Sequence, residues 1–177
     1  MRHVISVLVE NEPGVLSRVS GLFSGRGFNI ESLTVAETID PATSRMTIVT
    51  GGDDRILEQI TKQLNKLINI IKVNDLTGES FVSREMVLIK VSAEDSTRAE
   101  VLRIADIFRG KVVDVSPKSY TIEITGDENK LEAIIDLFKP LKILDIVRTG
   151  RVAIPRGKKD VRNNKKNHSR KDNESVL

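Results

Sequence analysis

Asn11, Gly14 and Asn29 are the residues of this sequence whose types and spacing indicate recognition of a small zwitterion. Asn11 and Gly14 lie in a turn between an apolar run and an amphipathic stretch, and Asn29 follows a second glycine-marked turn. The free N–H groups at the start of a helix carry about half a positive charge, which matches one carboxylate. Gly14 has no Cβ, so a ligand can approach its backbone. An asparagine can accept from an ammonium group or donate to a carboxylate.

Aliphatic residues near this turn would suit an apolar ligand side chain. They are Val9, Leu16, Ile30, Leu33 and Val35. The same residues also fit a purely structural interpretation, in which Asn11 caps the helix, Gly14 makes a tight turn and the aliphatic residues belong to the core. Spacing alone leaves both interpretations open.

The sequence does not support a phosphate-binding loop, a catalytic site or a thiolate metal site. A phosphate loop needs several glycines and a lysine, and the turn over residues 10–14 contains no lysine. The two histidines, His3 and His168, form no set with a serine and an aspartate, and Glu10 and Glu12 are interpreted as loop charges. The sequence has no cysteine, which excludes disulfides, thiolate metal sites and a cysteine nucleophile. The residues therefore give little support to an enzyme, and we expect no catalytic residue or metal site on this chain.

The positive charge is concentrated at the C-terminus. The formal net charge is +3, but residues 156–177 hold eight Lys and Arg against three Asp and Glu, so the other 155 residues carry −2. Almost nothing in this tail is apolar, so we expect residues 158–177 to be disordered. A basic tail also fits nucleic-acid binding, but this one lacks interleaved aromatic residues. A solubilising tail is the preferred interpretation.

Hydrophobic periodicity predicts the elements that must position the turn. In the first half we expect strands over 3–9, 28–39, 44–50 and 69–76. A helix is expected to begin at Pro13 and end near Gly25 and Gly27, with a second helix over 56–67.

The same order is predicted again in the second half. We expect strands over 84–92, 111–116, 119–125 and 141–147. A helix with an apolar stripe of Ala99, Leu102, Ala105 and Phe108 is expected between the first two of these strands, and another over 131–138 between the last two.

The predicted order is therefore βαββαβ twice, joined near residues 77–83. This order favours an α+β fold of two ferredoxin-like sandwiches in tandem. The expected domains are 1–78 and 84–157, followed by the tail 158–177. A unit of this size has a small core and one uncovered sheet face, so we expect a homodimer.

Five stretches resemble one family. The stretches "ENEPGVLSRVSGLFSGRGFNIESLTV" and "SRMTIVT" are similar to the first domain of the small, regulatory subunits of acetolactate synthase (acetohydroxyacid synthase), which is an amino-acid-sensing ACT domain. The stretches "REMVLIKV", "IFRGKVVDVS" and "RTGRVAIPRG" resemble the second domain and the end of the same subunits. The resemblance covers roughly residues 1–157.

The resemblance implies a subunit without its own active site. Such a subunit binds and activates a large catalytic subunit and confers feedback inhibition by valine, or by leucine or isoleucine, in branched-chain amino-acid biosynthesis. Thiamine diphosphate, Mg²⁺ and FAD would lie on that catalytic partner, with no cofactor on this chain. The effector would lie between two ACT domains paired side by side. Asn11, Gly14 and Val15 would come from one chain and Asn29 and Ile30 from the other, with Val35 in the apolar wall.

Alternatives remain open from the sequence. A free-standing ACT-type sensor could control a different enzyme or a transcription factor, and co-purification of a thiamine-dependent partner separates the two. Because no apolar run approaches about 20 residues, we expect no membrane span. The lack of cysteine and of room for a signal peptide before His3 favours the cytoplasm.

Overall fold

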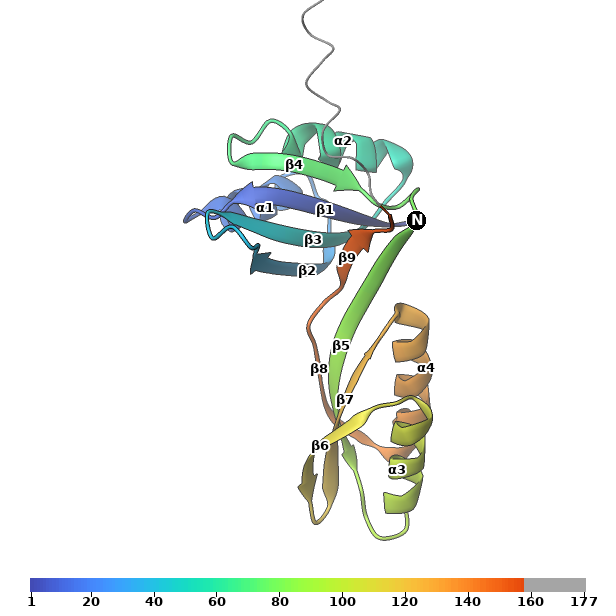
Figure 1. Ribbon diagram of the computed structural model, residues 1–177. Helices are drawn as coiled ribbons and strands as arrows, with labels where there is room; N and C mark the ends of the chain where they lie inside the picture. Colours follow the sequence, from blue (N-terminus) through green and yellow to red (C-terminus); the bar gives the residue numbers. More distant parts are fainter. Residues whose placement is uncertain (158–177) are drawn as a thin grey trace, which may run out of the picture.

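The computed structural model describes residues 1–157, which form two antiparallel sheets that are each covered on one face by two helices (Figure 1). The tail predicted for residues 158–177 lies outside the described residues. The α+β fold of two ferredoxin-like units in tandem is confirmed, since the order βαββαβ occurs twice. None of the described helices is long and apolar enough to cross a bilayer.

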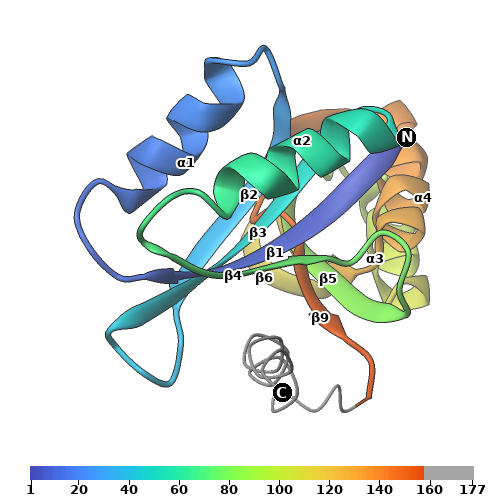
Figure 2. The same ribbon diagram turned by 90° about the horizontal axis from the view of Figure 1, so that it is seen from above.

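The first unit is a four-stranded sheet in the order β2-β3-β1-β4. Its elements are β1 (Arg2–Glu10), α1 (Val15–Ser24), β2 (Ile30–Glu37), β3 (Thr43–Gly51), α2 (Asp54–Leu64) and β4 (Ile70–Asp75). Figure 2, seen from above, shows α1 and α2 lying across this sheet. Alternate residues of β1 point to the helices, because side chains of a strand alternate between its faces. Ile5, Val7 and Val9 are thereby buried against the two helices.

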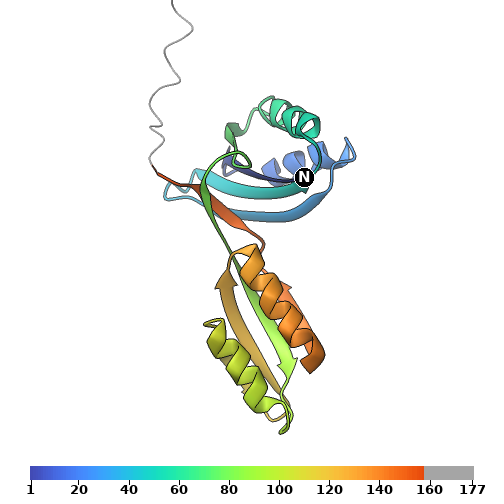
Figure 3. The ribbon, with the colours of Figure 1, turned by 90° about the vertical axis from the view of Figure 1, so that its right-hand side faces the viewer.

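The second unit is a sheet in the order β6-β7-β5-β8, with a further strand, β9, paired to β5. Its elements are β5 (Phe81–Ser92), α3 (Arg98–Ile107), β6 (Lys111–Ser116), β7 (Ser119–Gly126), α4 (Glu128–Phe138), the 3₁₀ turn η1 (Lys139–Leu141), β8 (Ile143–Arg148) and β9 (Val152–Pro155). Figure 3 shows α3 and α4 on one face of this sheet. Val87, Ile89 and Val91 of β5 are fully buried beneath them.

The first helix begins two residues later than predicted. Pro13 was expected at its first position, but α1 begins at Val15 because Gly14 adopts a left-handed φ of 84° that no helix residue shares. The predicted end is confirmed, since Gly25 caps the helix. The strand predicted over 28–39 is shorter, with bounds Ile30–Glu37.

Two predictions in the second unit are wrong in detail. The core stripe of α3 is Val101, Ile104 and Ala105, whereas the expected Leu102 is 39% exposed. The last predicted strand begins at Ile143 rather than at residue 141, because η1 and the positive φ of Lys142 turn the chain first.

Strand β9 was not predicted, and it connects the two units. Its four residues pair antiparallel with the start of β5, from Phe81 opposite Pro155 to Arg84 opposite Val152. Strand β5 begins at Phe81, inside the segment expected to join the domains, so the last residues of this segment belong to a two-stranded ribbon. Ala153 of β9 packs with Val4, Val49 and Leu76 of the first unit. The two units therefore share a small third core.

Candidate functional site

The turn after β1 is fixed to the hairpin between β2 and β3. The backbone N–H of Asn11 donates to the carbonyl of Ala42 at 2.8 Å. The Asn11 amide nitrogen donates to Glu37 Oε1 at 3.0 Å and to the carbonyl of Pro41 at 2.9 Å. Asn11 therefore does not cap the helix, as one interpretation of the sequence held. Its donors are used, and within residues 1–157 its side-chain oxygen has no hydrogen-bond partner, so that oxygen is the group free to accept from a ligand.

Gly14 leaves the start of α1 open. It occupies the N-cap position, and the helix start has no side-chain hydrogen bond, in contrast to α2 and α4, whose N-caps Asp53 and Asp127 each accept from a backbone N–H. A Cβ added at Gly14 would meet no heavy atom within 4 Å. The Val15 N–H donates to the carbonyl of Glu12 at 3.4 Å, and the start of α1 has no side-chain acceptor for the N–H groups that follow.

The remaining predicted residues lie on or beside β2, which is an edge strand. Asn29 is exposed, and its backbone carbonyl accepts from Thr50 Oγ1 at 2.6 Å. Ile30 is partly buried against the first core, and Val35 is 39% exposed. Val15, in contrast, is buried at 3% exposure in the core of the first unit. Its side chain therefore supports the helix and does not line a surface.

One chain does not bring all of these residues together. Asn11 contacts Glu37 at the end of β2, whereas Asn29 and Ile30 stand at its start. A strand rises about 3.3 Å per residue, so the two ends of β2 lie roughly 23 Å apart. The asparagine pair and the helix tip cannot contact one small molecule within a single chain.

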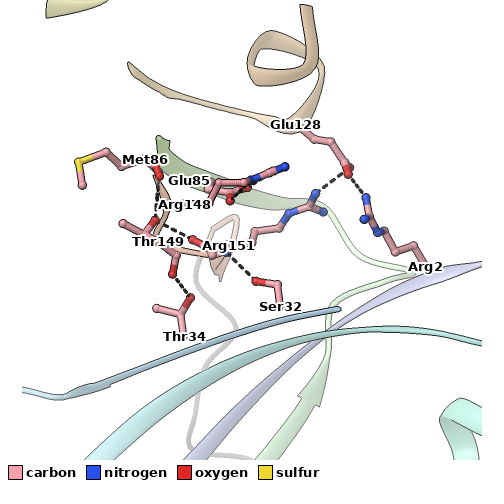
Figure 4. Close-up of polar contacts among 10 residues, drawn as sticks. Arg2, Ser32, Thr34, Glu85, Met86, Glu128, Arg148, Thr149 and Arg151 are labelled. Carbon is pink, nitrogen blue, oxygen red and sulfur yellow. Dashed lines mark hydrogen bonds and ion pairs between the residues drawn. The ribbon is translucent and has the colours of Figure 1, made fainter. Parts of the chain in front are cut away.

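A second polar cluster, which the sequence gave no reason to expect, lies between the two units (Figure 4). Arg148 donates twice to the Glu85 carboxylate, at 2.7 and 2.8 Å, and Arg151 pairs with Glu128 at 2.6 Å. Arg2 of the first unit also pairs with Glu128. These residues line a cavity of about 310 Å³. No local sequence pattern predicts this cluster, because its residues are far apart along the chain.

Glu85 is the most deeply buried carboxylate of this cluster, at 7% exposure. The hydrogen bonds from Arg148 lower the pKa of Glu85 below its ordinary value, although burial acts in the opposite direction. The same contact raises the pKa of Arg148. Both groups are therefore charged near neutral pH, and they hold the end of β8 against β5.

Histidine and carboxylate side chains are the remaining polar groups to place in the described part of the chain. His3 is 1% exposed, and its Nε2 lies 3.1 Å from the carbonyl of Gly52, so it belongs to the fold of the first unit. Among residues 1–157, no group of three or more His, Asp or Glu side chains is arranged to hold a metal ion.

Comparisons with known proteins give the same family for both units. A family model described as the AHAS small subunit-like ACT domain matches residues 5–72, and one described as the small subunit of acetolactate synthase matches residues 84–157. The chain is 54% identical over 162 residues to the acetolactate synthase small subunit of Haemophilus influenzae, covering 91% of this chain and 99% of that protein. It is 53% identical over 156 residues to the probable acetolactate synthase small subunit of Methanothermobacter thermautotrophicus, covering 88% and 93%.

A solved structure agrees in its fold. The crystal structure of the acetolactate synthase small subunit from Thermotoga maritima superposes with a TM-score of 0.82 at 45% sequence identity, covering 89% of this chain and 99% of that one. The matched families, the relatives and this structure span both units. The chain therefore belongs to the family of acetolactate synthase small subunits, whose first domain is an ACT domain.

Proposed function

We propose that this chain is a non-catalytic regulatory subunit that binds the catalytic subunit of acetolactate synthase, activates it and confers feedback inhibition by valine. The family membership of both units supports the role of a partner subunit in branched-chain amino-acid biosynthesis. Thiamine diphosphate, Mg²⁺ and FAD are assigned to the catalytic partner, in the cytoplasm. The alternative of a free-standing sensor is not favoured, because the second unit matches the same small-subunit family.

The geometry of β2 supports an effector site between two copies of the chain. Strand β2 has an open edge, which is a template for pairing with another strand. If two copies pair antiparallel along this edge, the start of β2 in one copy lies beside the end of β2 in the other. Asn29 and Ile30 of one copy then approach Asn11 and Gly14 of its partner. This arrangement joins the residues that a single chain holds about 23 Å apart.

The groups at this seam are complementary to a branched-chain amino acid. The open N-terminus of α1 would receive the carboxylate, and the free oxygen of Asn11 would accept from the ammonium group. Val35 and Ile30 would contact the aliphatic side chain. One methylene in an apolar pocket is worth only about 1–3 kcal/mol, so calorimetric titration with valine, leucine, isoleucine and serine is needed to rank the ligands.

A site divided between two chains provides a mechanism for inhibition. A ligand that binds only the paired arrangement favours it over any other, by the difference in binding free energy alone. At a ligand concentration one hundred times the dissociation constant, this difference is about 2.7 kcal/mol. That is sufficient to shift the docking geometry of a catalytic subunit.

Gly14→Asp tests the proposal. We expect this variant to lose valine inhibition while its activation of the catalytic subunit is largely kept. The new carboxylate would stand at the start of α1 and repel the carboxylate of valine by about 1–4 kcal/mol at close range, which lowers affinity about fivefold or more. The measurement is the steady-state activity of the reconstituted complex with and without valine.

Gly157→Asp is the matched control. Gly157 also has a positive φ, of 73°, and a Cβ there also meets no heavy atom within 4 Å, so the control reproduces the strain of the substitution without approaching α1. Normal valine inhibition in the Gly14→Asp complex would contradict the proposed site.

A further inference from the structure

The outer face of β2 is in contact with a turn of the second unit. Ser32 and Thr34 point to the sheet face away from α1 and α2, since they alternate with Leu33, which packs on the first core. Thr34 Oγ1 donates to the carbonyl of Thr149 at 3.2 Å, and Ser32 Oγ accepts from the backbone N–H of Arg151 at 3.1 Å (Figure 4). The contacts join residues more than 100 positions apart, so they exist only in the folded two-domain chain.

Gly150 allows the turn to approach β2 closely. Its φ is 82°, and a Cβ at this position would stand 2.7 Å from Thr34 Oγ1 and 2.8 Å from Ser32 Oγ. Only glycine therefore fits both the backbone conformation and the space above β2. Any side chain here would displace the turn from the strand or push the two hydroxyl groups aside.

The turn 149–151 is held firmly by the second unit. The backbone N–H of Thr149 donates to the carbonyl of Met86 at 3.0 Å, and Thr149 Oγ1 accepts from the backbone N–H of Met86 at 3.1 Å. Arg148, directly before the turn, is fixed by Glu85. The turn therefore moves with β5 and α4 of the second unit, and β2 is held between this turn and its own core.

We propose that the turn 149–151 is a positioning element for β2, so that the second unit sets the geometry of the effector site in the first. The inference rests on the proposed function, because β2 carries Ile30 and Val35 of that site and Asn29 directly precedes it. The turn contacts Ser32 and Thr34 on one face of the strand, and Leu33 and Val35 lie on the opposite face. A shift of the strand backbone at Ser32 or Thr34 would move Ile30 and Val35 with it.

Gly150→Ala and Thr34→Val test this role in the full-length protein. We expect Gly150→Ala to weaken valine binding tenfold or more, and Thr34→Val to weaken it about three- to tenfold, the contribution of one hydrogen bond. Thr34→Ser keeps the hydroxyl group and should restore wild-type affinity. Valine affinity is measured by calorimetry on the isolated protein. Because both variants break the same contact, their effects should be less than additive in the double variant.

Gly157→Ala is the control for backbone strain. Gly157 shares the positive φ of Gly150, but a Cβ at Gly157 would meet no heavy atom within 4 Å, so this variant should bind valine normally. Wild-type affinity in both Gly150→Ala and Thr34→Val would overturn the proposal. The proposal would also be overturned if both variants lost valine binding and lost activation of the catalytic subunit as well, because the turn would then support the fold as a whole.

Amide hydrogen exchange separates this inference from the proposed function. We expect the β2 amides bonded to β3 to exchange about tenfold faster in Gly150→Ala, with the amides of β1 unchanged. Unchanged exchange in β2 would contradict the positioning role. If the wild-type protein bound none of the four amino acids while β2 exchange still increased in the variant, the proposed effector function would fail and the structural role of the turn would stand.

Discussion

At the scale of single residues, the polar side chains of this protein divide into two groups with different surroundings. Asn11 and Asn29 are uncharged and exposed beside the first sheet. Glu85 and Arg148, in contrast, are joined by two hydrogen bonds between β5 and β8. In the proposed function the first group contacts a ligand, whereas the second holds β8 against β5.

Glu85→Gln should lower the free energy of unfolding by about 1–3 kcal/mol at pH 7, because it replaces charge-assisted hydrogen bonds at a buried site. The folded-state pKa of Glu85 is lowered, so the ionised carboxylate stabilises the fold above its unfolded-state pKa. This contribution is lost as the pH falls through the folded-state pKa. The difference between wild type and variant should therefore narrow on acidification, as measured by urea unfolding at pH 7 and at about pH 3.

Glu58→Gln is the matched control for this prediction. Glu58 pairs with Lys62 one turn along α2, and both side chains are more than half exposed. An exposed pair of this kind contributes little to stability, because water and salt screen it. A loss in Glu85→Gln no larger than in this control would show that the pair between β5 and β8 does not stabilise the fold.

At the scale of elements, the four helices differ in whether a side chain caps the backbone N–H groups at their start. Helices α2 and α4 begin with aspartates that accept from the backbone, at 2.9 Å for Asp53 and 3.0 Å for Asp127. Helices α1 and α3 begin without such a bond. An uncapped start costs some stability, and in the proposed effector site the start of α1 is the place that receives the ligand carboxylate.

Asp127→Ala should destabilise the protein by about 0.5–2 kcal/mol, since it removes the acceptor for the backbone N–H of Lys130 at the start of α4. Thr97→Ala changes the corresponding position of α3, where no capping bond exists, and should cost less than about 0.5 kcal/mol. Thermal unfolding of both variants measures the difference. Equal losses would mean that the Asp127 bond does not stabilise α4.

At the scale of the whole molecule, the two units are joined by more than a connection in sequence. The ribbon of β5 and β9 continues from one sheet to the other (Figure 1). Phe81 and Ala153 from this ribbon pack on Val4 and Leu76 at the edge of the first unit. Burial on both sides of the boundary predicts that the two units unfold together.

Ala153→Asp should separate the unfolding of the two units, because an unpaired carboxylate in this apolar cluster costs several kcal/mol. We expect a lower midpoint and a broadened or split transition in scanning calorimetry. Ile154→Asp is the control, since Ile154 follows directly in β9 but is 61% exposed. A single sharp transition in Ala153→Asp, equal to that of the control, would contradict the shared core.

Much of the fold was predictable from the sequence because it depends on local patterns. The order of the twelve principal helices and strands follows from periodicity, and the end of the first helix at Gly25 follows from residue type. The errors arise where two neighbouring apolar residues could each face the core, because periodicity alone does not decide which of them is buried. Leu102 and Val101 are both apolar neighbours on α3, and only packing against the sheet decides that Val101 is buried.

For the candidate site, residue types in the sequence predicted a chemistry, and the tertiary structure decided where each of these residues lies. The glycine at the tip of α1 and the two asparagines predict a site for a carboxylate and an ammonium group from residue type, and this assignment stays a prediction. Only the fold shows that Asn11 uses its donors on Glu37 and Pro41, and that Asn29 lies at the far end of β2. The contact of Ser32 and Thr34 with the turn around Gly150 joins residues over 100 positions apart. No local pattern encodes such a contact, because it depends on how two separately folded sheets pack.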